Sequence, residues 1–176
     1  GQCCLSYAIG GRSGNRGQCA QPCRKRYSLV DANGQVLQRG KHLLSLRDLS
    51  HSENLEELMA AGITSFKIEG RLKDKAYVAN STAWYRAKLD ALFEKTGRHR
   101  SSSGTSHVGF TPDIAKTFHR GYSDYFLHGR KGKIGSLDTP KMMGELLGPV
   151  RKVQGNKITL DTKAVLHSGD GICFLN

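Results

Sequence analysis

Leu55-Glu-Glu-Leu-Met-Ala-Ala-Gly62, followed at once by Ile63-Thr-Ser-Phe-Lys-Ile68, is the stretch that decides the fold class. In its first half, apolar residues recur at helical spacing until the glycine supplies a stop signal. Its second half is a short run with β-branched residues, which is typical of a strand. A helix, an Ala-Gly turn and a strand in this order predict an α/β fold with parallel strands.

Further elements are predicted on both sides of this stretch. Residues 27–37 have the pattern of a hairpin whose turn is Asn33-Gly34. The strongest helix pattern covers residues 74–94 and is closed by Gly97. Ser45-Leu-Arg-Asp48 has the spacing of a capping box, which is a signal that opens a helix.

The second half of the chain has a different pattern. A polar, serine-rich linker follows Gly97, and Thr111-Pro112-Asp113 is typical of the start of another helix. From Gly148 onward the chain alternates as short strands. These strands are predicted at residues 150–153, 157–160 and 171–174, with a turn at residues 154–156.

The charge of the chain points to an anionic partner. Its 176 residues include 27 Lys and Arg against 15 Asp and Glu, which gives a net charge of +12. Such a balance favours nucleic acid first and a membrane surface second. No apolar run approaches the roughly 18 residues that a membrane span needs. The start at Gly1 has no signal-peptide pattern, so we expect a cytoplasmic protein.

The basic residues are most concentrated at the start of the chain, where the first thirty residues contain no acid. Cationic side chains beside Tyr7 and Tyr27 are suited to hold phosphates while the rings stack on bases. A solvated basic surface is the alternative reading for such charges. The predicted RNA-binding residues are Arg12, Arg16, Arg24, Lys25 and Arg26.

Four of the five cysteines lie within the first 23 residues, at positions 3, 4, 19 and 23. Clustered thiols outside a secreted disulfide scaffold more often bind a metal or perform redox chemistry. Thiolates are soft ligands that suit iron–sulfur clusters or zinc, and the arginines nearby favour the thiolate form. The spacing of Cys3, Cys19 and Cys23 leaves free thiols equally open, and zinc is the main alternative metal.

Lys67, Glu69 and Arg71 form the second candidate site. Side chains alternate along a strand, so these three share one face, while Phe66 and Ile68 share the other. A Lys–Glu–Arg trio is suited to bind an anionic substrate or to poise a general base, and we expect these residues to be catalytic. The alternative is a structural ion pair at the end of the strand.

Several motifs resemble those of the peptidase U32 family. Gly1-Gln-Cys3, residues 14–17, Cys19 and Gln21-Pro-Cys-Arg24 resemble its cysteine signature. Phe66-Lys-Ile-Glu-Gly-Arg71 resembles the strand motif that follows. Its later segments resemble residues 118–122, 144–150 and 169–171. Within the family, the chain is most similar to the branch that makes 5-hydroxycytidine in large-subunit ribosomal RNA.

The resemblance implies a fold class of α/β plus β. Residues 1–100 would be the cysteine-rich segment and the C-terminal end of a TIM-like barrel. Residues 101–147 would be a linker and helical segment, and residues 148–176 the start of a small β-barrel. The family's first cysteine precedes the position of Gly1, so we expect a fragment of a longer enzyme, inactive on its own.

The resemblance also implies a function, which is iron–sulfur-dependent hydroxylation of a pyrimidine, cytidine, in structured ribosomal RNA. Cys3, Cys19 and Cys23 match three of the four ligand positions of a [4Fe–4S] cluster, whereas Cys4 and Cys173 match none. The branch is associated with prephenate as a required metabolite. The two alternatives are a collagenase-like U32 peptidase and an RNA-binding module without catalysis.

Overall fold

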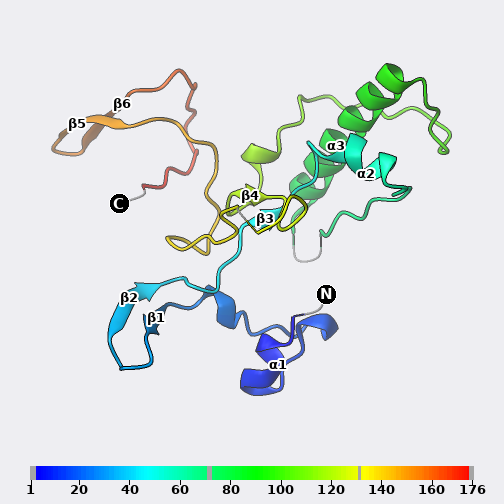
Figure 1. Cartoon of the computed structure of the whole chain (residues 1–176). Coiled ribbons are helices and arrows are strands. Elements are labelled where there is room, and N and C mark those ends of the chain that lie inside the picture. Colours follow the sequence, from blue (N-terminus) through cyan, green and yellow to red (C-terminus); the bar gives the residue numbers. More distant parts are fainter. Residues whose placement is uncertain (1–2, 71–72, 131, 175–176) are drawn as a thin grey trace.

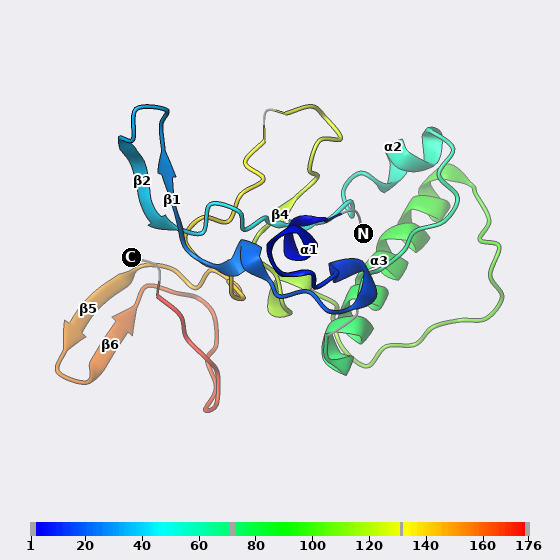
Figure 2. The same ribbon diagram turned by 90° about the horizontal axis from the view of Figure 1, so that it is seen from below.

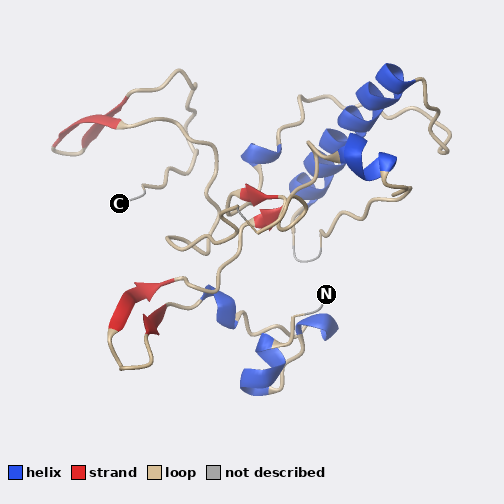
Figure 3. Cartoon of the chain, in the orientation of Figure 1, coloured by secondary structure: helices blue, strands red, loops and turns tan. Residues whose placement is uncertain are grey.

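The computed structural model describes residues 3–70, 73–130 and 132–174 (Figures 1 and 3). One long helix, two short helices and several short strands are joined by long loops. The helices are α1 Leu5–Gly10, α2 Leu55–Ala60 and α3 Lys75–Thr96, with single 3₁₀ turns η1 Gly14–Arg16, η2 Pro22–Arg24 and η3 Ile114–Lys116. The strands are β1 Tyr27–Val30, β2 Val36–Lys41, β3 Asp48–Leu49, β4 Tyr122–Ser123, β5 Val150–Gln154 and β6 Lys157–Leu160.

The six strands form three separate pairs. β1 pairs with β2, and β5 pairs with β6, both antiparallel. β3 pairs with β4 in parallel, with Asp48 opposite Tyr122. Within the described residues no sheet exceeds two strands, so the TIM-like barrel and the small β-barrel stay predictions.

Both predicted hairpins are confirmed, because their signals are local. In the first, one carboxylate oxygen of Asp31 accepts hydrogen bonds from the backbone N–H groups of Asn33 and Gln35, at 2.9 and 2.8 Å. Gly34 has a φ of 83°, a left-handed conformation that favours glycine. Gly155 has the corresponding role in the β5–β6 turn, with a φ of 53°.

α3 confirms the strongest helix prediction. The Asp74 carboxylate accepts a hydrogen bond from the Tyr77 backbone N–H at 2.7 Å, which caps the N-terminus, and the left-handed Gly97 follows the C-terminus. Asn80 is buried and exchanges two hydrogen bonds with the backbone of Asp113, at 2.6 and 2.8 Å. These bonds hold η3 against the first half of α3.

Three predicted elements are not formed in the described chain. Residues 63–68 and 171–174 contain no strand. A strand exists only through hydrogen bonds to a neighbour, and the described chain pairs neither segment. Ser45-Leu-Arg-Asp48 opens no helix, because Asp48 lies in β3 and its carboxylate binds Arg120 instead. The helix predicted from residue 111 is confirmed only as the single turn η3.

The chain is unusually open. Its accessible surface is 13,672 Å², whereas a compact protein of 19.3 kDa exposes about 8,500 Å². Leu55 and Ala83 are the only buried hydrophobic residues in the described part. Figures 1 and 2 agree that the two hairpins project away from α3 and from the β3–β4 pair. No helix in the described ranges is long and apolar enough to cross a bilayer.

Candidate functional site

The cysteine-rich segment folds around one buried serine. Ser6 in α1 is only 1% exposed, and its hydroxyl accepts a hydrogen bond from the backbone N–H of Ala20 at 2.9 Å. The Tyr27 hydroxyl donates to the carbonyl of the buried Pro22 at 2.7 Å. These two bonds bring α1, the Cys19 loop and η2 into one small unit, although it contains almost no apolar core.

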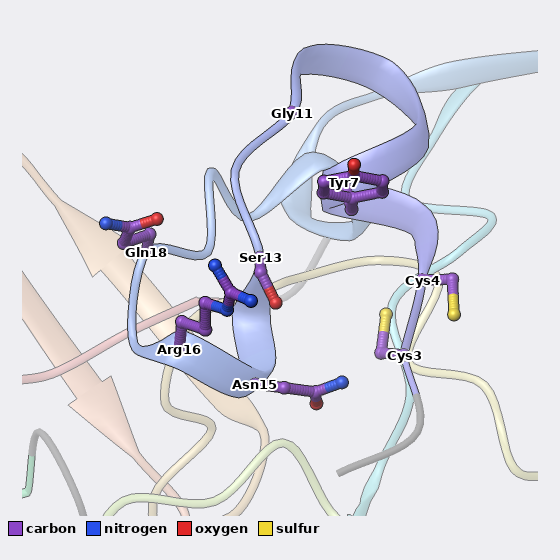
Figure 4. A pocket seen from close by; sticks show the side chains of 8 residues that line it. All are labelled: Cys3, Cys4, Tyr7, Gly11, Ser13, Asn15, Arg16 and Gln18. Carbon is purple, nitrogen blue, oxygen red and sulfur yellow. The ribbon is translucent and has the colours of Figure 1, made fainter.

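Cys3 and Cys4 line a hollow of about 320 Å³ beside α1 (Figure 4). The opposite side carries polar groups from the η1 region, and the Tyr7 ring lies at one end. The polar lining comes from Ser13, Asn15, Arg16 and Gln18. The hollow therefore combines thiols with hydrogen-bond donors and one guanidinium.

Cys19 and Cys23 lie outside this lining. The Cys19 sulfur accepts a weak hydrogen bond from the Gln21 backbone N–H at 3.3 Å, and Cys23 lies within η2. All five thiols are free of disulfides. In residues 3–70, 73–130 and 132–174, no three His, Cys, Asp or Glu side chains come together as a metal site. The donor chemistry suits iron–sulfur, but the described residues do not bring Cys3, Cys19 and Cys23 together around one point.

Lys67 and Glu69 point to the same side of an irregular segment, as their spacing predicts. The Lys67 ammonium lies 3.0 Å from the Glu69 carboxylate, and both side chains are at least three-quarters exposed. An exposed pair of this kind contributes little to stability. Arg71, the third predicted member, lies outside the described residues.

The five basic residues predicted to bind RNA are available to a ligand. Arg12, Arg16, Lys25 and Arg26 are exposed, and Arg24 is half-buried. Among the described residues, none of the five has a carboxylate within ion-pair distance. No carboxylate of the described residues therefore neutralises their charge.

A second cluster lies where β3 meets the segment after η3. The Asp48 carboxylate accepts three hydrogen bonds from Arg120, from its backbone N–H at 2.8 Å and from its guanidinium at 2.9 and 3.2 Å. The Lys73 ammonium lies 3.1 Å from the centre of the Phe118 ring, and the Arg24 guanidinium lies 5.8 Å from the same centre. Two cations thus lie over one aromatic ring, and the Asp48–Arg120 pair lies close enough to act on Lys73.

His119 fixes the geometry of this segment. The buried ring accepts a hydrogen bond at Nδ1 from the Gly121 backbone N–H, so Nε2 carries the proton that it donates to the Ala115 carbonyl. The ring also stacks on Tyr122, with 4.7 Å between centroids. Phe118 and Arg120 flank His119 in sequence and are held in place with it.

Burial and the neighbouring charges of the cluster shift the pKa of Lys73. Burial lowers the pKa of its ammonium, the Asp48 carboxylate opposes that shift, and the Arg24 and Arg120 cations add to it. Asp48 and Lys73 were not predicted as site residues. The nearest sequence signal was Phe118-His-Arg-Gly-Tyr122, one of the motifs that resemble the U32 family.

The model of peptidase family U32 matches residues 1–136 of the chain. The chain belongs to the peptidase U32 family. This U32 chain is 49% identical to a 23S rRNA 5-hydroxycytidine synthase of Escherichia coli, over 99% of the chain and 27% of that relative. The predicted family is therefore confirmed.

Two further U32 relatives have different names. A collagenase of Porphyromonas gingivalis is 32% identical over 76% of the chain and 36% of its own length. A tRNA hydroxylation protein of Bacillus subtilis is 38% identical over 52% of the chain and 23% of its own length. The chain thus spans about a quarter to a third of the length of these relatives. No solved structure matches it.

Proposed function

We propose that the protein containing this chain hydroxylates a pyrimidine, cytidine, in ribosomal RNA. The observation that carries the proposal is the 49% identity with an rRNA 5-hydroxycytidine synthase over 99% of the chain. The relative named for tRNA hydroxylation supports the same reaction class. The net charge of +12 and the unpaired basic side chains fit an RNA substrate.

The residues of this chain would contribute binding and orientation. Arg12, Arg16, Lys25 and Arg26 are exposed cations that can neutralise backbone phosphates. Tyr7, which is 64% exposed beside the hollow at Cys3, offers a ring on which an unpaired base can stack. Such contacts would hold a single-stranded or looped part of the RNA against the cysteine-rich segment.

The cofactor is the finer part of the proposal. Hydroxylation of a ring carbon is a two-electron oxidation, which calls for a redox cofactor or an oxidant. We propose an iron–sulfur cluster with Cys3, Cys19 and Cys23 among its ligands, with prephenate as co-substrate and zinc as the alternative metal. The described residues do not gather these three thiols, so the proposal needs a rearrangement of this segment in the full-length protein.

The catalytic role predicted for Lys67, Glu69 and Arg71 also stays a proposal. The Lys67–Glu69 pair is exposed, so its two charges are accessible to an incoming anionic substrate. Replacing Glu69 by Gln in the full-length protein should reduce product formation if the pair acts on the substrate. An unchanged product yield would leave the pair a surface ion pair.

The test is complementation with the full-length protein in cells that lack its gene. We expect 5-hydroxycytidine in digested ribosomal RNA, detected by mass spectrometry, from the native protein and from Cys173→Ser, the matched control. Cys19→Ser should abolish it. The absence of the modified nucleoside with the native protein would overturn the proposal. Bound iron and sulfide, measured after anaerobic purification, test the cofactor separately.

A collagenase-like peptidase is the second candidate, favoured by the 32% identity with a named collagenase over 76% of the chain. Incubation of the purified full-length protein with gelatin and with native collagen distinguishes the two functions. Cleavage that Glu69→Gln abolishes would support the peptidase. A full-length protein that modifies RNA and leaves both proteins intact would exclude it.

A further inference from the structure

The cluster around Phe118 retains uncompensated positive charge. The carboxylates of Asp48 and Asp74 both act on Lys73, but Arg120 already engages both oxygens of Asp48, and Asp74 accepts the hydrogen bond from the Tyr77 backbone N–H that caps α3. Against these two carboxylates stand three cations, Lys73, Arg24 and Arg120. The side chains of this pair are only 28% and 15% exposed, so the pair is largely fixed. Lys73 and Arg24 have no ion-pair partner among the described residues.

The Phe118 ring holds these two cations in place without neutralising them. An aromatic face attracts a cation through its quadrupole, but it carries no net charge. Lys73, at 3.1 Å from the ring centre, and Arg24, at 5.8 Å, therefore converge while keeping their full charge for a ligand. A carboxylate in the place of the ring would have cancelled one of them.

We propose that Lys73 and Arg24, held by the Phe118 ring, bind one phosphodiester group of the RNA backbone. This inference rests on the proposed function, because it takes the substrate to be RNA. Arg24 supplies a planar fork of donors and Lys73 a point charge, a combination that suits the oxygens of a phosphate. The site joins η2 to the segments at residues 73 and 118, which lie far apart in sequence.

The surroundings favour a polyanion over a small anion. Lys25 and Arg26 follow Arg24 directly in sequence and are both exposed, so two further accessible cations adjoin the central pair. A nucleic acid strand places its phosphates at regular intervals and can use such a series of cations. A small anion would use only the central pair.

The first test is the salt dependence of RNA binding by the full-length protein. A fluorescent RNA hairpin is titrated at several salt concentrations, and the slope of log affinity against log salt is compared between variants. Lys73→Gln should reduce the slope by about one unit, because one phosphate contact is lost. Lys163→Gln, which removes an exposed lysine outside the cluster, is the matched control and should leave the slope unchanged. Equal slopes for the native protein and Lys73→Gln would overturn the proposal.

The second test follows the Lys73 ammonium itself and does not depend on a substitution being tolerated. The pKa of Lys73 in the full-length protein is measured by NMR of the isotopically labelled lysine, with and without the hairpin. We expect the pKa to rise on binding, because a phosphate favours the charged form that burial and the neighbouring cations disfavour. An unchanged pKa at saturating RNA would overturn the proposal. A rise that inorganic phosphate at low concentration reproduces in full would also overturn it, in favour of a free-anion site.

Both tests measure binding, so they separate this inference from the proposed function. A protein whose RNA affinity depends on Lys73, but which makes no 5-hydroxycytidine, keeps the phosphate site and loses the hydroxylation proposal. A protein that makes 5-hydroxycytidine with an unchanged salt slope in Lys73→Gln keeps the function and loses the phosphate site.

Discussion

The carboxylate of Asp48 joins two segments that lie 72 residues apart, through three hydrogen bonds to Arg120. Asp48→Asn keeps the size of the side chain but removes its charge, and the bidentate contact with the guanidinium is lost. A hydrogen bond to a charged group contributes about 1.5–3 kcal/mol, and we expect a loss of stability at the lower end of that range. Urea unfolding of the protein, followed by circular dichroism, measures it.

The matched control is Asp138→Asn. Asp138 also makes a short ion pair, 2.7 Å from the Lys41 ammonium, but its side chain is 68% exposed. Water screens such a pair, so we expect no measurable change in the unfolding midpoint. Equal effects of the two substitutions would show that the Asp48–Arg120 contact does not stabilise this fold.

We predict that the pKa of His128 lies above the usual value of a histidine side chain. Its Nδ1 lies 2.8 Å from the Asp124 carboxylate, and its Nε2 lies 2.9 Å from that of Glu57. The hydrogen bond to Asp124 is the larger cause that raises the pKa of His128, and the bond to Glu57 is the next. NMR of the histidine ring protons should therefore give a raised pKa, which Asp124→Asn lowers more than Glu57→Gln.

The direction of the pH effect follows from this shift. Because the folded pKa of His128 is raised, its stabilising contribution is complete below the unfolded value of about 6.5 and is lost as pH rises through the folded pKa. His128→Asn should remove this part of the pH dependence of unfolding. A native pKa at or below the unfolded value would contradict the ring's placement between two carboxylates.

Gly148 lies two residues before β5, and its backbone conformation fixes how the chain enters the β5–β6 hairpin. It has a φ of 131°, and a Cβ at this position would collide with the backbone carbonyl of Asp161. Gly148→Ala must therefore shift the backbone on one side of the hairpin. We expect faster amide exchange at Asp161, whose N–H donates to the Pro149 carbonyl at 3.0 Å. Gly171→Ala, where a Cβ meets open space at an ordinary φ, should leave that exchange rate unchanged.

Sequence predicted the elements whose signals are local. Asn33-Gly34 marks the turn of β1–β2, and Asp74 with Gly97 marks the two ends of α3, because turns and caps are made by neighbouring residues. The Asp48–Arg120 contact gave no such signal. Its partners are distant in the chain, and the short spacing around Asp48 instead resembled a capping box.

In the candidate site, too, some features follow from local sequence rules and others depend on how distant segments pack together. The exposure of the basic residues near the start of the chain and the contact between Lys67 and Glu69 follow from composition and from alternation along an extended chain. The approach of Lys73 to Phe118 depends on how β3, α3 and the segment after η3 pack together. No spacing rule within one segment encodes that approach.

At the scale of the whole molecule, the excess surface requires an explanation. The chain exposes 13,672 Å², and its exposed apolar residues include Ile63 and Ile68 in the segment that was predicted to be a strand. The chain spans 27% of the E. coli relative, so most of a protein of that length would be available to cover this surface. We therefore expect residues 63–68 to pair as a strand of a TIM-like barrel in the full-length protein.

Hydrogen exchange followed by mass spectrometry tests this expectation on the full-length protein. Peptides that cover residues 63–68 should exchange slowly, because a central barrel strand uses its backbone N–H groups in hydrogen bonds on both sides. The same residues in the isolated chain should exchange at rates close to those of the serine-rich loop at residues 101–106, which has no regular structure. Fast exchange at residues 63–68 in the full-length protein would contradict a barrel strand at this position.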